Sequence, residues 1–93
     1  MRIHELAVEI PVTIKKDVSS YIAYSPALDL ASQGDSVQDA KRMFAEAAEL
    51  FIEECERMNT LDDVLLDLGW EKIQNEWHPP AFEQTSERVR MPA

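Results

Sequence analysis

Carboxylates are the residues of this 93-residue chain with the clearest chemical potential, because clustered carboxylates can hold the two metal ions that cleave a phosphodiester bond. The acidic residues in question are Asp17, Asp29, Glu53, Glu54 and Glu56. Their spacing argues against a cluster. Asp17 lies in a predicted turn, and at about 100° per residue the three glutamates spread around the polar side of a predicted helix. We therefore predict no catalytic residues and no metal site.

Other reactive residue types are isolated. His4 and His78 have no partner at zinc-ligand spacing, and Cys55 is alone on an apolar helix side, where it packs as a small hydrophobe. Two glycines do not make a phosphate-binding loop. Trp70 and Trp77 could stack on bases, but an acidic chain without a basic groove favours core or interface packing. No cofactor is expected.

The charge of the chain is negative and uneven, with a formal net value of −9. Residues 1–34 hold three basic and four acidic residues, 35–69 three and ten, and 70–93 three and four, so the net charges are −1, −7 and −1. The acidic middle would repel nucleic acid and attract a basic protein. We expect no direct nucleic-acid binding. A solvated helix face is the alternative interpretation of the acidic middle.

The composition predicts one cytoplasmic domain. No apolar run approaches the ~20 residues that cross a bilayer. The residues Arg2–Glu5 lead into alternating rather than continuous apolar residues, unlike a signal peptide. A single cysteine excludes an internal disulfide.

The strongest pattern is a long amphipathic helix from Val37 to Met58. Ser36 can cap its start, and Asp39 completes a capping-box pattern. We predict that its apolar side covers a sheet, with both phenylalanines in the core. At ~1.5 Å per residue the helix is about 33 Å long, longer than a strand of ~17 to 20 Å, and overhangs the sheet. The apolar positions recur at three- and four-residue steps: Val37, Ala40, Met43, Phe44, Ala47, Leu50, Phe51, Cys55 and Met58.

Three strands are predicted before this helix. Apolar and polar residues alternate from Leu6 to Lys15, which predicts a long first strand with an edge or a bulge at Pro11. Tyr21–Ser25 has the content of a second strand, which Pro26 ends. Alternation from Leu28 to Gln33 predicts a third, weaker strand.

After the helix, Thr60 can cap a second helix over Leu61–Leu68, with Gly69 as its C-cap. Trp70–Trp77 is either one strand or a hairpin that turns at Gln74-Asn75, and the spacing leaves both open. The predicted fold is α+β, in the order β-β-β-α-(α)-β. A three- to four-stranded, mainly antiparallel sheet is covered on one face by the long helix. We expect a domain over residues 1–78 and a flexible tail over 79–93.

Three stretches of the chain resemble the HicB family of antitoxins. The pattern of that family is close to Y-[VI]-A-x-x-P-x-L, then S-Q-G-[DE]-[ST], then a helix with Glu-Ala near its start. This chain has YIAYSPAL at 21–28 and SQGDS at 32–36. It has Asp39-Ala40 in the helix, and Asp29-Leu30-Ala31 replaces the commoner Pro-Gly-Cys type of segment. The resemblance covers about Ile3 to Gly69.

The resemblance implies a partial ribonuclease-H-like domain with a further strand after the helix, which matches Trp70–Trp77. It implies the antitoxin of a type II toxin-antitoxin pair, which binds and silences HicA, a small basic toxin that cleaves messenger RNA. The alternatives are a small nucleic-acid-processing or metal-dependent enzyme on the same fold, or an orphan HicB-like protein-interaction domain. Many members also carry a C-terminal DNA-binding module. Residues 70–93 are too short for one, so no separate DNA-binding domain is expected.

The expected toxin-binding residues are Tyr21, Tyr24, Leu28 and Asp29, because aromatics on a rigid strand lose little entropy on docking. The alternative places Tyr24 in the core and leaves only Tyr21 exposed. The sequence does not choose between these arrangements.

We also expect a homodimer or a higher even-numbered oligomer. Its expected interface is Trp70, Ile73 and Trp77, which together are more apolar surface than so small a core readily absorbs. Exchange of the last strand between copies is one route to such an assembly.

Overall fold

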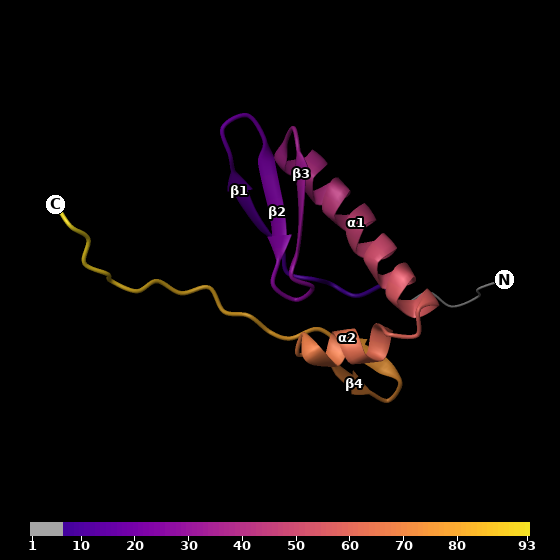
Figure 1. Cartoon of the computed structure of the whole chain (residues 1–93). Coiled ribbons are helices and arrows are strands. Elements are labelled where there is room, and N and C mark those ends of the chain that lie inside the picture. The colour runs from indigo at the N-terminus through magenta and orange to yellow at the C-terminus, as the bar shows by residue number, and fades with distance from the viewer. Residues whose placement is uncertain (1–6) are drawn as a thin grey trace.

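The fold is described from a computed structural model, in which residues 7–93 are described, so His4 and Leu6 lie outside the described residues. The elements are β1 (Thr13–Lys16), β2 (Tyr21–Ser25), β3 (Leu30–Gly34), α1 (Val37–Arg57), α2 (Leu61–Asp67), β4 (Glu71–Ile73) and β5 (Glu76–His78). The main sheet has the strand order β1-β2-β3 and is antiparallel, and α1 covers one of its faces (Figure 1). This is the predicted α+β fold. The last two strands pair only with each other.

The first strand is shorter than the predicted ten residues. Its ladder with β2 includes only Thr13–Lys16. Continuing the register from Thr13 and Tyr24 sets Pro11 opposite Pro26, and neither proline has an N–H to donate. The predicted alternation persists beyond the ladder, because the apolar side chains at every second position still pack against the core: Ile10, Val12 and Ile14.

The third strand begins at Leu30, later than predicted, because the two residues before it belong to the β2–β3 turn. Asp29 has a left-handed backbone with φ of 51°, which a strand does not allow. Leu28 turns into the core instead and is 3% exposed. Ser25 is fully buried, and its hydroxyl accepts a hydrogen bond of 3.1 Å from the N–H of Ala27. The burial of Leu28 and the hydrogen bond between Ser25 and Ala27 therefore fix the conformation of the turn.

The start of α1 follows the prediction. The hydroxyl of Ser36 accepts a hydrogen bond from the N–H of Asp39 at 3.0 Å. The carboxylate of Asp39 accepts one from the N–H of Asp35 at 2.9 Å. This bond, together with the hydrogen bond from Arg42, holds the pKa of Asp39 below its ordinary value.

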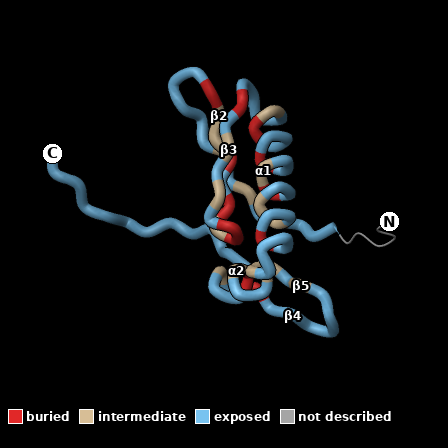
Figure 2. Tube along the Cα trace, turned by 45° about the vertical axis from the view of Figure 1, so that its right-hand side comes forward, coloured by how far each residue is buried: buried red, intermediate tan, exposed pale blue. Residues whose placement is uncertain are grey.

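The covered side of α1 is narrower than predicted. Buried positions lie between α1 and the sheet (Figure 2), and on α1 they are Ala40, Phe44, Ala48 and Cys55. Phe51 is only half-buried, which corrects its prediction as a full core residue. Met43, Leu50 and Met58 are 37%, 66% and 59% exposed, because three strands are too narrow to cover the whole apolar side.

Gly34 lies at the closest approach of β3 to α1. A Cβ atom on it would lie 2.4 Å from the backbone N of Ala40 and 2.6 Å from the backbone C of Asp39. Because backbone atoms cannot rotate aside, we expect Gly34→Ala to lower the free energy of unfolding by about 1 to 3 kcal/mol. Chemical denaturation measures this loss. A change below about 0.5 kcal/mol would mean that the first turn of α1 is not packed on β3.

The second helix lies where it was predicted, but the predicted side-chain cap by Thr60 is not formed. Thr60 makes no side-chain hydrogen bond to the N-terminus of α2; its hydroxyl instead donates to the carbonyl of Cys55, at 3.3 Å, and so closes the end of α1. Gly69 has φ of 94°, the left-handed conformation of the predicted C-cap.

Residues 71–78 form a hairpin, which settles the alternative that the sequence left open for Trp70–Trp77. The turn residues Gln74 and Asn75 both have positive φ, 51° and 68°, as a two-residue hairpin turn requires. The pair does not add a fourth strand to the main sheet.

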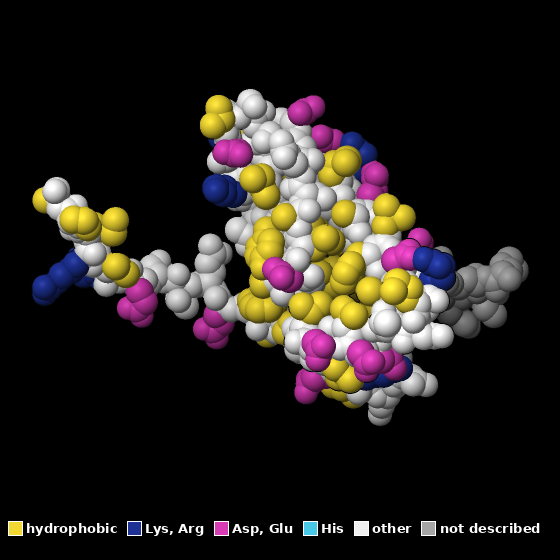
Figure 3. Space-filling view, in the orientation of Figure 1, with side chains coloured by type: hydrophobic (Ala, Val, Ile, Leu, Met, Phe, Trp, Pro, Cys, Tyr) yellow, Lys and Arg dark blue, Asp and Glu magenta, His cyan; other side chains and the backbone are white. Residues whose placement is uncertain are grey.

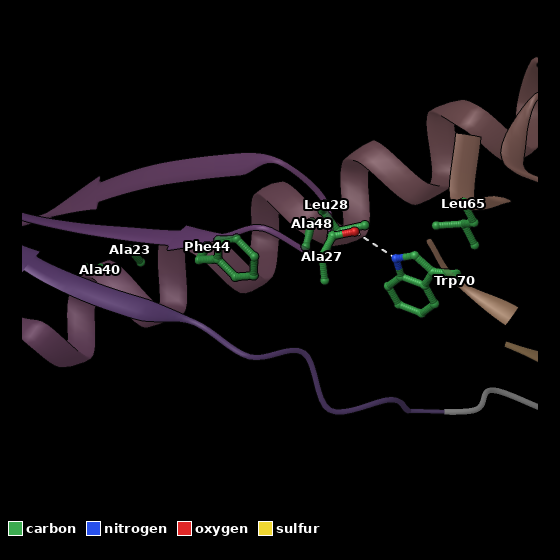
Figure 4. Packing of buried hydrophobic residues seen from close by; sticks show 8 residues of the cluster. All are labelled: Ala23, Ala27, Leu28, Ala40, Phe44, Ala48, Leu65 and Trp70. Carbon is green, nitrogen blue, oxygen red and sulfur yellow. Dashed lines mark hydrogen bonds between the residues drawn. The ribbon is translucent and has the colours of Figure 1, made fainter. Parts of the chain in front are cut away.

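Trp70 joins this second unit to the sheet. Its indole N–H donates a hydrogen bond of 2.7 Å to the carbonyl of Ala27 in the β2–β3 turn (Figure 4). Its side chain is 3% exposed and belongs to one core cluster with Leu65 and Leu28. Trp70 therefore links the β2–β3 turn to the unit formed by α2 and the hairpin.

The last residues hold no helix or strand from Pro79 onward, and residues 81–93 are all exposed. They extend away from the domain (Figure 1), which raises the radius of gyration to 15.9 Å from the ~12 Å of a compact chain of this length. Among residues 7–93, no helix is long and apolar enough to cross a bilayer.

Candidate protein-binding surface

Two of the four predicted toxin-binding residues come together on the surface. Tyr24 is 39% exposed, and its hydroxyl donates a hydrogen bond of 2.9 Å to the carboxylate of Asp29. The hydrogen bond and the nearby negative charge raise the pKa of Tyr24, because ionisation would lose the bond and set two anions side by side. Asp29 can adopt the left-handed backbone of the turn more readily than most residues.

The other two predicted residues are placed elsewhere. Tyr21 is half-buried, and its ring faces the Lys16 ammonium, 5.2 Å from the ring centre. Because side chains alternate along a strand, Tyr21 lies on the helix side of the sheet and Tyr24 on the opposite side. Leu28 is a core residue and offers almost no surface. The arrangement with Tyr24 in the core is wrong, and the four residues do not form one patch.

A surface that the sequence did not predict lies on α1, on the side next to β3. We name it the α1 stripe and define it as Met43, Ala47 and Leu50, which follow one another at helical steps of four and three residues. The hydroxyl of Ser32 on β3 donates to the carbonyl of Met43, at 3.4 Å, which fixes this side of the helix. Leu50 is 66% exposed. The stripe is therefore apolar and accessible.

Acidic side chains flank the α1 stripe. Figure 3 shows hydrophobic side chains gathered over α1 and the strands beside it, with acidic ones along the outer side of α1 and over α2. Arg42 bridges Asp39 and Glu46, at 2.6 and 2.7 Å, and Arg57 pairs with Glu54. These exposed pairs are worth little individually. Ten acidic against three basic residues still leave this part of the chain strongly negative.

An acidic recess lies where α1 meets α2. It has a volume of about 250 Å³. Asp62 on its rim lies 3.6 Å from the ammonium of Lys72, so this carboxylate already binds a cationic side chain. A lysine or an arginine from another protein fits the same chemistry. The lining residues are Glu56, Asn59, Leu61, Asp62 and Asp63.

The three residues predicted for an oligomer interface differ in exposure. Trp70 is buried within its own chain, so it offers no interface while the hairpin stays in place. Trp77 is half-buried and faces the ammonium of Lys72, which lies 5.3 Å from its ring centre. Ile73 is 51% exposed and is the one of the three with a large free apolar surface.

The acidic residues considered for catalysis stay apart. Among residues 7–93, no three His, Cys, Asp or Glu side chains are close enough to hold one metal ion. One hollow, of about 560 Å³, has mainly apolar walls that include Leu61, Leu65 and Trp70. Cys55 is buried on α1.

Comparison with known proteins adds no relative: no protein-family model, no curated protein and no solved structure matches this chain. The class defined by the fold and the surface is therefore a small α+β domain with an acidic, partly apolar helical face.

Proposed function

We propose that this chain is the cytoplasmic antitoxin of a type II toxin-antitoxin pair and that it binds and neutralises a small basic HicA-like toxin that cleaves messenger RNA. The resemblance of residues 21–28 and 32–36 to the HicB pattern supplies the partner. The observation that carries the proposal is the α1 stripe, an uncovered apolar strip in the segment that also holds the net charge of −7.

The two properties of this surface have different roles in binding. The negative charge steers a basic partner and raises the association rate, an effect that salt screens. Affinity requires an apolar centre from which water is excluded, and exposed Leu50 and Met43 are suited to that position. The acidic recess at the α1–α2 corner can accept one basic side chain at the rim. Tyr24 and Asp29 lie on the other side of the sheet and form a separate, smaller candidate contact.

Co-expression with a small basic neighbouring gene tests the proposal. We expect that gene alone to arrest growth, this chain to relieve the arrest, and the two proteins to co-purify at low and moderate salt. Leu50→Arg in this chain should abolish both relief and co-purification, because it sets a charge on the most exposed residue of the stripe. Val18→Arg is the matched control, since Val18 is 95% exposed in the β1–β2 turn.

Two outcomes would contradict the proposal. One is a harmless neighbour that does not co-purify with this chain at any salt concentration. The other is relief of toxicity that both arginine variants retain, which would place the toxin contact away from the α1 stripe. Cleavage of RNA by this chain itself, with a divalent metal ion, would favour the enzyme alternative.

A further inference from the structure

Within residues 7–93, the outer edge of β1 is unpaired. The strand order makes β1 an edge of the sheet, and no other element of the described chain lies along its outer side (Figure 1). The chain before it continues beyond the end of β2 without a strand partner, yet keeps the alternation of partly buried Ile10, Val12 and Ile14 with exposed residues. We name residues 8–16 the β1 edge. An open edge of this kind is a template for another strand.

The hydrogen-bond pattern of the β1–β2 hairpin tells which groups point outward. The N–H of Asp17 donates to the carbonyl of Ser20 at 2.8 Å, in the same register that pairs Lys16 with Tyr21. Hydrogen-bonded pairs alternate with non-hydrogen-bonded ones along an antiparallel ladder. The odd-numbered residues of β1 therefore point their backbone N–H and C=O groups toward β2. The even-numbered residues point theirs toward the outer edge.

Pro11 is compatible with pairing at this outer edge. Its position is odd, so the N–H that it lacks would have pointed toward the β2 side. The tail residues Phe82–Gln84 line a hollow with Pro11, Val12, Thr13 and Pro26. Continuing the alternation of β1 back to residue 8 makes Val8, Ile10, Val12, Ile14 and Lys16 the outward donors of the edge.

We propose that two copies of this chain pair along their β1 edges, antiparallel, with Val12 on the two-fold axis. In this register the two copies set Glu9 opposite Lys15 twice. They also set Ile10 opposite Ile14 twice, on the face that α1 covers. Shifting the axis to Thr13 sets Lys15 opposite Pro11, and shifting it to Ile14 sets Lys15 opposite Thr13. Of these three axes, only the one at Val12 sets complementary charges opposite each other, and the β1 edge is complementary to itself in that register.

An apolar groove beside the β1 edge supports a second copy as the occupant. It has a volume of about 350 Å³ and lies between residues 7–12 and the flank of α1 that faces β1. A two-fold axis perpendicular to the sheet keeps the helix side of both copies on the same side. The isoleucine and valine side chains of the partner would then enter this groove. Its walls include Val8, Ile10, Val12, Phe44, Ala48 and Ile52.

Reversal of charge tests the register. The mass of the purified full chain in solution, measured by sedimentation equilibrium at tens of micromolar, should be that of a dimer. Glu9→Lys and Lys15→Glu should each weaken dimerisation by roughly tenfold or more, because each variant sets two like-charged pairs in contact. The double variant should restore it. Glu87→Lys makes the same charge change as Glu9→Lys on the exposed tail and should have no effect.

Removal of a donor tests the edge itself. Val12→Pro takes away the central outward N–H of both copies and should give a monomer. Far-ultraviolet circular dichroism checks that the variants are folded, and the charge reversals decide the matter if Val12→Pro is not. A monomeric parent protein, or a dimer that persists in all three edge variants, would overturn the proposal; the latter would place the interface elsewhere, for example at Ile73. No toxin is involved, so failure here is distinct from failure of the proposed function.

Discussion

Replacing Trp70 by alanine is expected to lower the free energy of unfolding by about 3 to 5 kcal/mol, because the change leaves a cavity between α2, the hairpin and the β2–β3 turn. The indole is 3% exposed and donates to the carbonyl of Ala27 at 2.7 Å. Trp70→Phe keeps most of the volume but leaves that carbonyl unpaired, which should cost about 1 to 3 kcal/mol. Urea or guanidinium denaturation measures both variants.

Trp77→Ala is the matched control, since Trp77 is half-buried and its indole makes no hydrogen bond to another residue of the described chain. Its loss should be less than half of that for Trp70→Ala. Equal losses for the two tryptophans, or a loss below about 1 kcal/mol for Trp70→Ala, would mean that the hairpin is not docked through Trp70.

Replacing Phe44 by alanine is expected to cost about 3 to 5 kcal/mol, since its ring is 4% exposed between α1 and the sheet. Single domains are stable by only about 5 to 15 kcal/mol, so this change should remove much of the total. Leu50→Ala on the same helix is the control and should change the stability by no more than about 0.5 kcal/mol. A larger effect at Leu50 than at Phe44 would show that the opposite side of α1 faces the sheet.

Much of the fold could be predicted because local signals and tertiary structure agree. The capping pattern of Ser36 and Asp39 marks the start of α1, and its hydrogen bonds are present. Gly69 has the left-handed backbone that its C-cap position requires. The order of elements follows from periodicity alone.

The errors in the fold prediction concern features that depend on contacts between residues far apart in the sequence. The alternation of side chains in the first strand was predicted correctly, but its length was not. Ladder pairing also requires a partner strand with N–H groups, and β2 ends just before Pro26. The period of α1 identified its apolar side but not the width of the sheet beneath it. Met43 and Leu50 were therefore predicted to be covered and are exposed.

The candidate surface was predicted only in part. Tyr24 and Asp29 were predicted and are hydrogen-bonded to each other on the surface. Leu28 was also predicted, but it lies in the core, in the turn where Asp29 has a left-handed backbone. No sequence signal distinguishes an inward from an outward residue in such a turn. The α1 stripe had one available signal: a 33 Å helix, at ~1.5 Å per residue, carries more apolar positions than a short three-stranded sheet can cover.

RNA cleavage by the purified basic neighbour, in the presence and absence of this chain, tests the central claim most directly. The proposed function predicts that one equivalent of this chain abolishes cleavage, that Val18→Arg does the same, and that Leu50→Arg leaves cleavage intact. Higher salt should slow the onset of inhibition, because it screens the acidic face of α1. Cleavage that continues unchanged in an excess of the folded parent chain would contradict the claim.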